Sequence, residues 1–170
     1  VGLATVCSIV INGTLLKAGI PMDSRFGGTL QIQNHKPLRF TEIIHYNGCS
    51  LDPSEIFIRA KMTSVKEAAL TGSGEILANF REIPAVCQPL ASRVLEGLAQ
   101  AKVGGTITIG NISEALCEVP VDPNKVGIIL LGGLNPVAAA QEAGIEAENH
   151  SMSTTMFYEQ LVDYKEILCG

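Results

Sequence analysis

A glycine pair followed by a sequence typical of a helix start is the first candidate for chemistry in this chain. Gly132 and Gly133 follow an apolar run, and Asn135 and Pro136 come directly after them. Asparagine is favoured at the N-cap of a helix, and proline is tolerated at its first position. Backbone N–H groups exposed at a helix start attract anions. We therefore expect residues 132–135 to bind an anion, with a tight turn under close packing as the alternative.

Two arginines beside turns could hold the charge of a carboxylate. Arg25 precedes Gly27-Gly28, and Arg81 lies in the segment F-R-E-I-P. The planar guanidinium group donates paired hydrogen bonds to a carboxylate. We predict that Arg25 and Arg81 contact the ligand. The alternative for each is a solvated charge or a salt bridge to Asp23 or Glu82.

A hydroxyl-rich segment near the end of the chain could add further polar contacts. Ser151, Ser153 and Thr154 supply side-chain donors and acceptors there, and we include them among the candidate ligand-binding residues. For Ser153, capping of a following helix is the favoured alternative.

Signatures of catalysis are weak. The sequence has no G-x-S-x-G elbow, no Walker A lysine and no G-x-G-x-x-G. His35, His45 and His150 lie far apart along the chain, so we predict no metal site and no cofactor. The five cysteines are scattered without a C-x-x-C pair, which favours a reducing, cytoplasmic setting. We expect no enzyme activity; the alternative is a small-molecule enzyme with Cys87 or Cys117 as its nucleophile.

The composition indicates a folded domain with an aliphatic core. Apolar residues make up 46% of the 170 residues, and Trp is absent. A net charge of −5 makes this chain alone a poor candidate for binding nucleic acid. No apolar run reaches the roughly 20 residues of a membrane helix, and the first residues lack the basic start of a signal peptide. Because the chain begins with Val1, we expect that it was cut from a longer protein.

Helix and strand patterns surround the candidate residues. Residues 126–131 are apolar on both alternating faces, as in a strand covered on two sides, and the helix after Gly132-Gly133 ends at Gly144. Ser64 and Glu67 form an S-x-x-E capping box for a short helix at 64–70, and the charge of Glu67 would repel an anion there. We further expect helices within 1–20, at 87–101 and at 153–161, and strands around 30–32 and at 39–46, 55–61, 75–80, 105–109, 115–119 and 164–168.

Two halves of the chain echo each other. G-G-T-L-Q-I at 27–32 is similar to G-G-T-I-T-I at 104–109, and Asp-Pro pairs follow at 52–53 and 122–123. We predict one internally duplicated domain at 1–170, with pseudo-repeats of about residues 1–86 and 87–170. The predicted fold class is α+β, with mixed or mainly antiparallel sheets and helices packed on them.

Longer segments resemble a known family. V-D-P-N-K-V-G-I-I-L-L at 121–131, G-G-L-N-P-V-A-A-A-Q-E-A-G-I at 132–145, F-R-E-I-P at 80–84 and S-M-S-T at 151–154 are similar to the regulatory domain of NrpR, the archaeal repressor of nitrogen-assimilation genes. The resemblance implies an oligomeric repressor with an N-terminal winged-helix DNA-binding domain, which this chain lacks, and one or two regulatory domains. It also implies that 2-oxoglutarate is sensed and that its binding lowers operator affinity.

The residues and the resemblance together predict an effector-sensing and oligomerisation domain of a transcriptional repressor. We expect a cytoplasmic homodimer that contacts DNA only through the N-terminal domain and does not contact a membrane. Backbone N–H groups at 132–135 and Arg25 or Arg81 would bind the dicarboxylate 2-oxoglutarate. Besides the cysteine enzyme, the remaining alternative is a purely structural dimerisation module.

Overall fold

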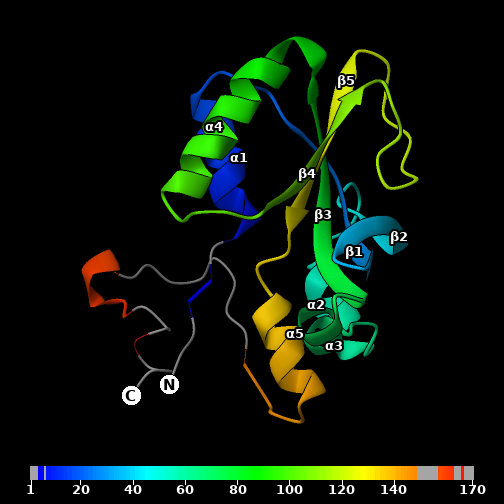
Figure 1. Cartoon of the computed structure of the whole chain (residues 1–170), viewed down its shortest axis with the longest axis vertical. Helices are drawn as coiled ribbons and strands as arrows, with labels where there is room; N and C mark the ends of the chain where they lie inside the picture. The colour runs from blue at the N-terminus through cyan, green and yellow to red at the C-terminus, as the bar shows by residue number, and fades with distance from the viewer. Residues whose placement is uncertain (1–3, 6, 149–156, 163–165, 167–170) are drawn as a thin grey trace.

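The computed structural model describes residues 4, 5, 7–148, 157–162 and 166 (Figure 1). A five-stranded antiparallel sheet in the order β2-β1-β3-β5-β4 forms its centre, which confirms the predicted α+β class. The elements follow the chain in the order α1 (Ser8–Lys17), β1 (Asp23–Gln33), β2 (Lys36–His45), α2 (Pro53–Arg59), α3 (Val65–Thr71), β3 (Gly74–Pro84), the 3₁₀ turn η1 (Ala85–Cys87), α4 (Gln88–Gln100), β4 (Thr106–Ile112), β5 (Lys125–Leu131), α5 (Asn135–Glu142) and the 3₁₀ turn η2 (Tyr158–Gln160).

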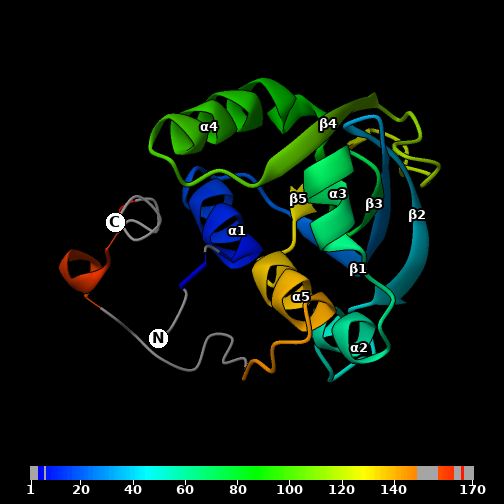
Figure 2. The ribbon, with the colours of Figure 1, turned by 60° about the horizontal axis from the view of Figure 1, so that its bottom comes forward.

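The helices cover one face of the sheet in two groups. Figures 1 and 2 both show α1 beside α4, and α5 beside α2 and α3. Ile11 and Leu15 of α1 pack with Leu95 of α4 against β3 and β5. Phe57 of α2 and Ala138 of α5 form a second core with the other end of β3. On this face, the two helical groups therefore pack over opposite ends of β3.

Aromatic rings fill the core on the opposite face. Phe26 of β1 stacks on Phe80 of β3 with ring centroids 5.2 Å apart, and Phe40 of β2 meets Phe26 edge-on at 4.9 Å. Leu116 and Val121, from the loop before β5, pack against the same cluster. Because both faces are covered, residues 77–83 of β3 are all buried.

The segment at 55–61 was predicted as a strand, and this prediction is wrong. The segment forms most of α2, in which Pro53 occupies the first turn and Asp52 accepts a hydrogen bond from the Ser54 N–H at 2.9 Å. The adjacent residues Phe57 and Ile58 are both buried, which a strand with alternating faces does not allow. Tertiary packing and the Asp-Pro cap outweigh the apparent alternation.

The strand predicted at 115–119 is also wrong. This segment is a turn that holds one isolated bridge between Leu116 and Val119, with Cys117 and Glu118 at positive φ. The strands predicted around 30–32 and at 39–46, 75–80, 105–109 and 126–131 are confirmed, as are the helices within 1–20 and at 64–70, 87–101 and 135–144. Most of the strand predicted at 164–168 and residues 153–156 of the helix predicted at 153–161 lie outside the described residues, and residues 158–160 form the 3₁₀ turn η2.

The two halves of the predicted duplication differ in structure at their Asp-Pro pairs. Gly27 and Gly28 lie within β1, and Gly104 and Gly105 directly precede β4. The Asp-Pro pair at 52–53 begins α2, whereas the pair at 122–123 lies in the loop before β5. The two pseudo-repeats at 1–86 and 87–170 therefore stay a prediction.

Phe80 tests how far the fold depends on the aromatic core. Its side chain is fully buried, with 0% exposed. We expect Phe80→Ala to lower the free energy of unfolding by about 3–5 kcal/mol, because the removed ring leaves a cavity. Urea denaturation followed by circular dichroism measures this loss. The matched control is Phe157→Ala, which removes a ring that is 73% exposed, and an equal effect of both variants would contradict the assignment of the core.

Candidate functional site

The turn between β5 and α5 is held close to β3. The Gly132 N–H donates to the Leu77 carbonyl at 2.8 Å. A Cβ atom at Gly132 would lie 2.8 Å from the Leu77 Cβ and 2.9 Å from the Leu77 carbonyl oxygen. Only glycine lets the turn lie this close to Leu77. Close packing therefore accounts for Gly132, as the tight-turn alternative states, whether or not the turn binds an anion.

Asn135 fixes the start of α5, although not as the predicted N-cap. The N-cap position belongs to Leu134, and Asn135 is the first helical residue. Its buried amide accepts from the Leu77 N–H at 2.8 Å and donates to the carbonyls of Leu77 and Gly132, both at 2.9 Å. The predicted capping role is wrong, because the side chain turns back to pair with the backbone of β3.

A cavity of about 340 Å³ opens at this turn, between the starts of α1 and α5. The Thr5 hydroxyl donates to the Gly133 carbonyl at 2.7 Å and joins the segment before α1 to the turn. The predicted residues Gly132, Gly133 and Asn135 all line the cavity. Its other lining residues are Thr5, Cys7, Ser8, Ile11, Val65, Gly104, Gly105, Leu131, Pro136 and Ala139.

Arg81 is a buried cation on the helix-covered face of β3. Only 4% of the residue is exposed, and it forms no ion pair with a carboxylate of the described residues. Its Nη1 donates to the Phe80 carbonyl at 3.5 Å, and its Nε has no partner. A buried charge without a counter-ion is unfavourable. Arg81 therefore has hydrogen-bonding capacity that the described protein groups do not use.

Tyr46 packs against Arg81, and neither residue is among those that line the cavity. The Arg81 guanidinium lies 4.9 Å from the centroid of the Tyr46 ring, and the Tyr46 hydroxyl donates to the Asn79 side chain. A Cβ atom at Gly27 would lie 3.0 Å from the Tyr46 hydroxyl oxygen, so the glycine leaves room for this ring. Burial raises the pKa of Tyr46, Arg81 lowers it, and a charge on Cys7 would raise it.

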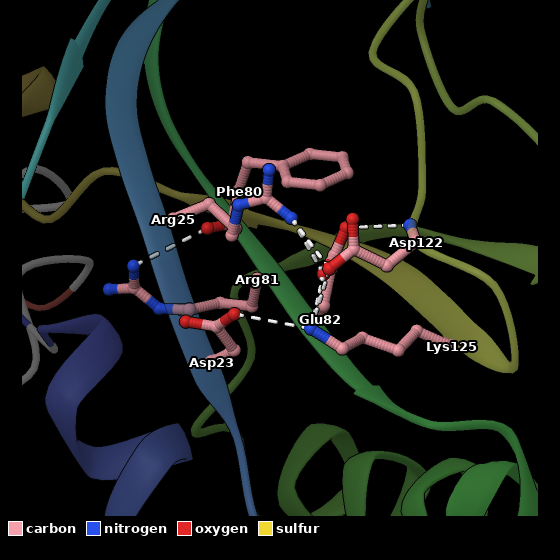
Figure 3. Close-up of polar contacts among 7 residues, drawn as sticks. All are labelled: Asp23, Arg25, Phe80, Arg81, Glu82, Asp122 and Lys125. Carbon is pink, nitrogen blue, oxygen red and sulfur yellow. Dashed lines mark hydrogen bonds and ion pairs between the residues drawn. The ribbon is translucent and has the colours of Figure 1, made fainter.

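Arg25 belongs to a different environment. Its guanidinium group lies 2.8 Å from the carboxylate of Glu82 and 3.4 Å from that of Asp122, so the salt-bridge alternative is confirmed for this residue. Lys125 joins the same carboxylates and that of Asp23. In Figure 3 the guanidinium groups of Arg25 and Arg81 point in opposite directions. Dashed lines join the carboxylates to Arg25 and Lys125, whereas the line from Arg81 leads to the Phe80 carbonyl. Of the two predicted arginines, Arg81 is the one left available to a ligand.

The predicted residues Ser151, Ser153 and Thr154 lie outside the described residues, so their contact with a ligand stays a prediction. The cysteine alternative is weakened at Cys117, because burial raises the pKa of its thiol and a protonated thiol is a poor nucleophile.

The predicted capping box at α3 is wrong, and Glu142 at the end of α5 caps this helix instead. Its carboxylate accepts from the N–H groups of Val65 and Lys66, each at 2.8 Å. Ser64 does not cap α3, since its hydroxyl accepts from the Glu75 N–H at 2.7 Å. No local sequence pattern could reveal Glu142, because it lies 77 residues from Val65.

The ion cluster around Glu82 predicts a dependence of stability on pH. The Lys125 ammonium group lowers the pKa of Asp122 below its ordinary value of 3.8. A carboxyl group with a lowered folded-state pKa stabilises the fold above its unfolded pKa, and this contribution disappears as the pH falls through the folded pKa. We expect Asp122→Asn to lower the urea midpoint at about pH 7 and to have little effect at about pH 2. An equal loss at both pH values would contradict this.

Comparisons with known proteins agree with the resemblance. A family model described as NrpR regulatory domains NRD1 and 2 matches residues 1–163. The global nitrogen regulator NrpRI of Methanosarcina mazei is 42% identical over 161 residues, which are 95% of this chain and 50% of the relative. The global nitrogen regulator NrpR of Methanocaldococcus jannaschii is 30% identical over 97% of this chain and 28% of the relative.

A solved structure is also similar. The crystal structure of a nitrogen repressor-like protein from Methanococcus jannaschii has a TM-score of 0.71 and 30% sequence identity, covering 87% of this chain and 61% of that chain. This chain thus spans half or less of the length of the two curated relatives. Because the family model matches almost the whole sequence, the chain belongs to the family of NrpR regulatory domains.

Proposed function

We propose that this domain senses 2-oxoglutarate for a repressor of nitrogen-assimilation genes. Its family and the names of its relatives support a regulatory role in nitrogen control. The observation that carries the proposal of a carboxylate effector is Arg81, a cation with 4% exposure, no carboxylate partner and a free Nε. A carboxylate is the group that best satisfies a guanidinium fork in a site with little water.

A second anchor is available at the turn before α5. The N–H groups of Gly132 and Asn135 bind carbonyl groups of the protein, so we assign those of Gly133 and Leu134 to the second carboxylate. Gly132 pairs with Leu77, which lies four residues before Arg81 on β3. Four strand residues cover about 13 Å, a separation that an arginine side chain and a five-carbon dicarboxylate can span together.

The lining of the cavity favours an oxo acid over an amino acid. None of the described residues that line it is acidic, so a dianion meets no repulsion from a neighbouring carboxylate. The ammonium group of glutamate would find no counter-charge among these residues, and burying it would cost binding free energy. The site therefore favours 2-oxoglutarate over glutamate, which differs at the carbon that carries the oxo group.

The effector acts on DNA binding through the arrangement of the repressor. In this proposal the repressor is a cytoplasmic homodimer whose DNA contacts belong to a winged-helix domain outside this chain. A ligand shifts an equilibrium between arrangements only as far as it binds one better than the other. 2-Oxoglutarate prefers the arrangement with low operator affinity, which links nitrogen shortage to expression.

The test is the substitution Arg81→Met with two measurements. Isothermal titration calorimetry of the wild-type chain should show 2-oxoglutarate binding that exceeds that of succinate and glutamate. Arg81→Met should raise the dissociation constant of 2-oxoglutarate at least tenfold. Its free energy of unfolding should be unchanged or raised by about 1–4 kcal/mol, because replacing a buried charge by an apolar side chain is often favourable.

The matched control is Arg93→Met, which removes an exposed arginine of α4 and should change neither measurement. Absence of heat for all three ligands at millimolar concentration would contradict the sensing role and favour a structural dimerisation module. If Arg81→Met binds 2-oxoglutarate as tightly as the wild type does, Arg81 does not contact the ligand.

A further inference from the structure

Helix α3 packs on the core through the partly buried Val65, and polar contacts hold its two ends. It has seven residues, and none of them is buried. Isolated helices of this length are unstable in water, so α3 depends on the groups that hold its ends. At its C-terminal end, the Gly72 carbonyl accepts from the His35 N–H at 2.8 Å. At its N-terminal end, the principal partner is Glu142.

Glu142 binds the start of α3 with both carboxylate oxygens. Oε1 accepts from the Thr63 hydroxyl and from the Val65 N–H, and Oε2 accepts from the Lys66 N–H, all at 2.8 Å. Hydrogen bonds to an ionised acceptor are stronger than neutral ones, and a negative charge is favourable at a helix N-terminus. This three-bond contact, the Glu142 clamp, joins the end of α5 to the start of α3.

Both helices joined by the Glu142 clamp also line the cavity. α5 starts at the turn that contains Gly132 and Gly133, and α3 contributes Val65 to the wall. Glu142 is the last residue of α5, and Asn135, its first, is anchored to β3. The two turns of α5 therefore connect the turn directly to the backbone N–H groups of Val65 and Lys66.

We propose that Glu142 is a positioning residue that couples occupancy of the cavity to the order of α3. This inference rests on the proposed function, because it takes 2-oxoglutarate as the ligand of the cavity. A carboxylate bound at Gly133 and Leu134 fixes the start of α5, and the Glu142 clamp then fixes α3 against the cavity. Because coupling is reciprocal, loss of the Glu142 clamp also weakens the binding of the ligand.

The experiment is hydrogen–deuterium exchange of the 170-residue chain with and without saturating 2-oxoglutarate, read on peptides that cover residues 63–72. In the wild type the ligand should slow exchange in α3. Glu142→Gln should speed exchange in α3 without ligand and abolish the slowing that the ligand causes. It should also weaken the binding of 2-oxoglutarate about fivefold or more. Glu67→Gln, which removes an exposed carboxylate of α3 itself, is the matched control and should behave as the wild type.

A second variant keeps the test decisive if Glu142→Gln folds poorly. Thr63→Val removes one of the three hydrogen bonds without changing the charge and should give a reduced response to the ligand. If the wild type binds 2-oxoglutarate and both variants keep its full slowing of exchange in α3, the clamp is only structural and the inference is overturned. If the wild type does not bind 2-oxoglutarate, the proposed function and the inference both fail.

Discussion

The alternation of side chains along β3, with both faces of the strand covered, is the constraint on which the rest of the structure depends. Phe80 and Glu82 point to one face, where aromatic rings and the ion cluster surround them. Asn79 and Arg81 point to the other face, where both contact Tyr46. The same strand therefore carries a satisfied buried carboxylate and, next to it in sequence, a buried guanidinium group without a carboxylate partner.

This asymmetry separates a charge that the fold compensates from one that it leaves without a carboxylate partner among the described residues. Glu82 has an unexposed side chain with cationic partners at 2.8 and 3.0 Å, so its charge is compensated within the fold. Arg81 contacts the Tyr46 side chain and makes one long hydrogen bond to a carbonyl, and none of the described carboxylates forms an ion pair with it. Retaining such a group lowers stability, and it is characteristic of binding sites that are completed by their ligand. In the proposed function, the ligand extends from the cavity at Gly132 and Gly133 to Arg81.

How much the sequence could predict depended on whether the information was local. Apolar runs and glycine turns located β5, the turn and α5, and the turn does line a cavity. Long-range partners were not visible. The residue type of Asn135 favours capping of its own helix. Its side chain instead pairs with the backbone of Leu77, which lies 58 residues away in the sequence. Likewise, both arginines have an acidic residue within two positions in the sequence. Only the fold shows that Arg25 pairs with the distant carboxylates of Glu82 and Asp122, while Arg81 pairs with no carboxylate of the described residues.

The most direct test of the central claim is a crystal structure of the chain with 2-oxoglutarate. The account predicts one carboxylate within hydrogen-bonding distance of Arg81 Nε, and the other at the N–H groups of Gly133 and Leu134. Electron density for the ligand at a site away from β3, with Arg81 Nε still without a partner, would contradict it.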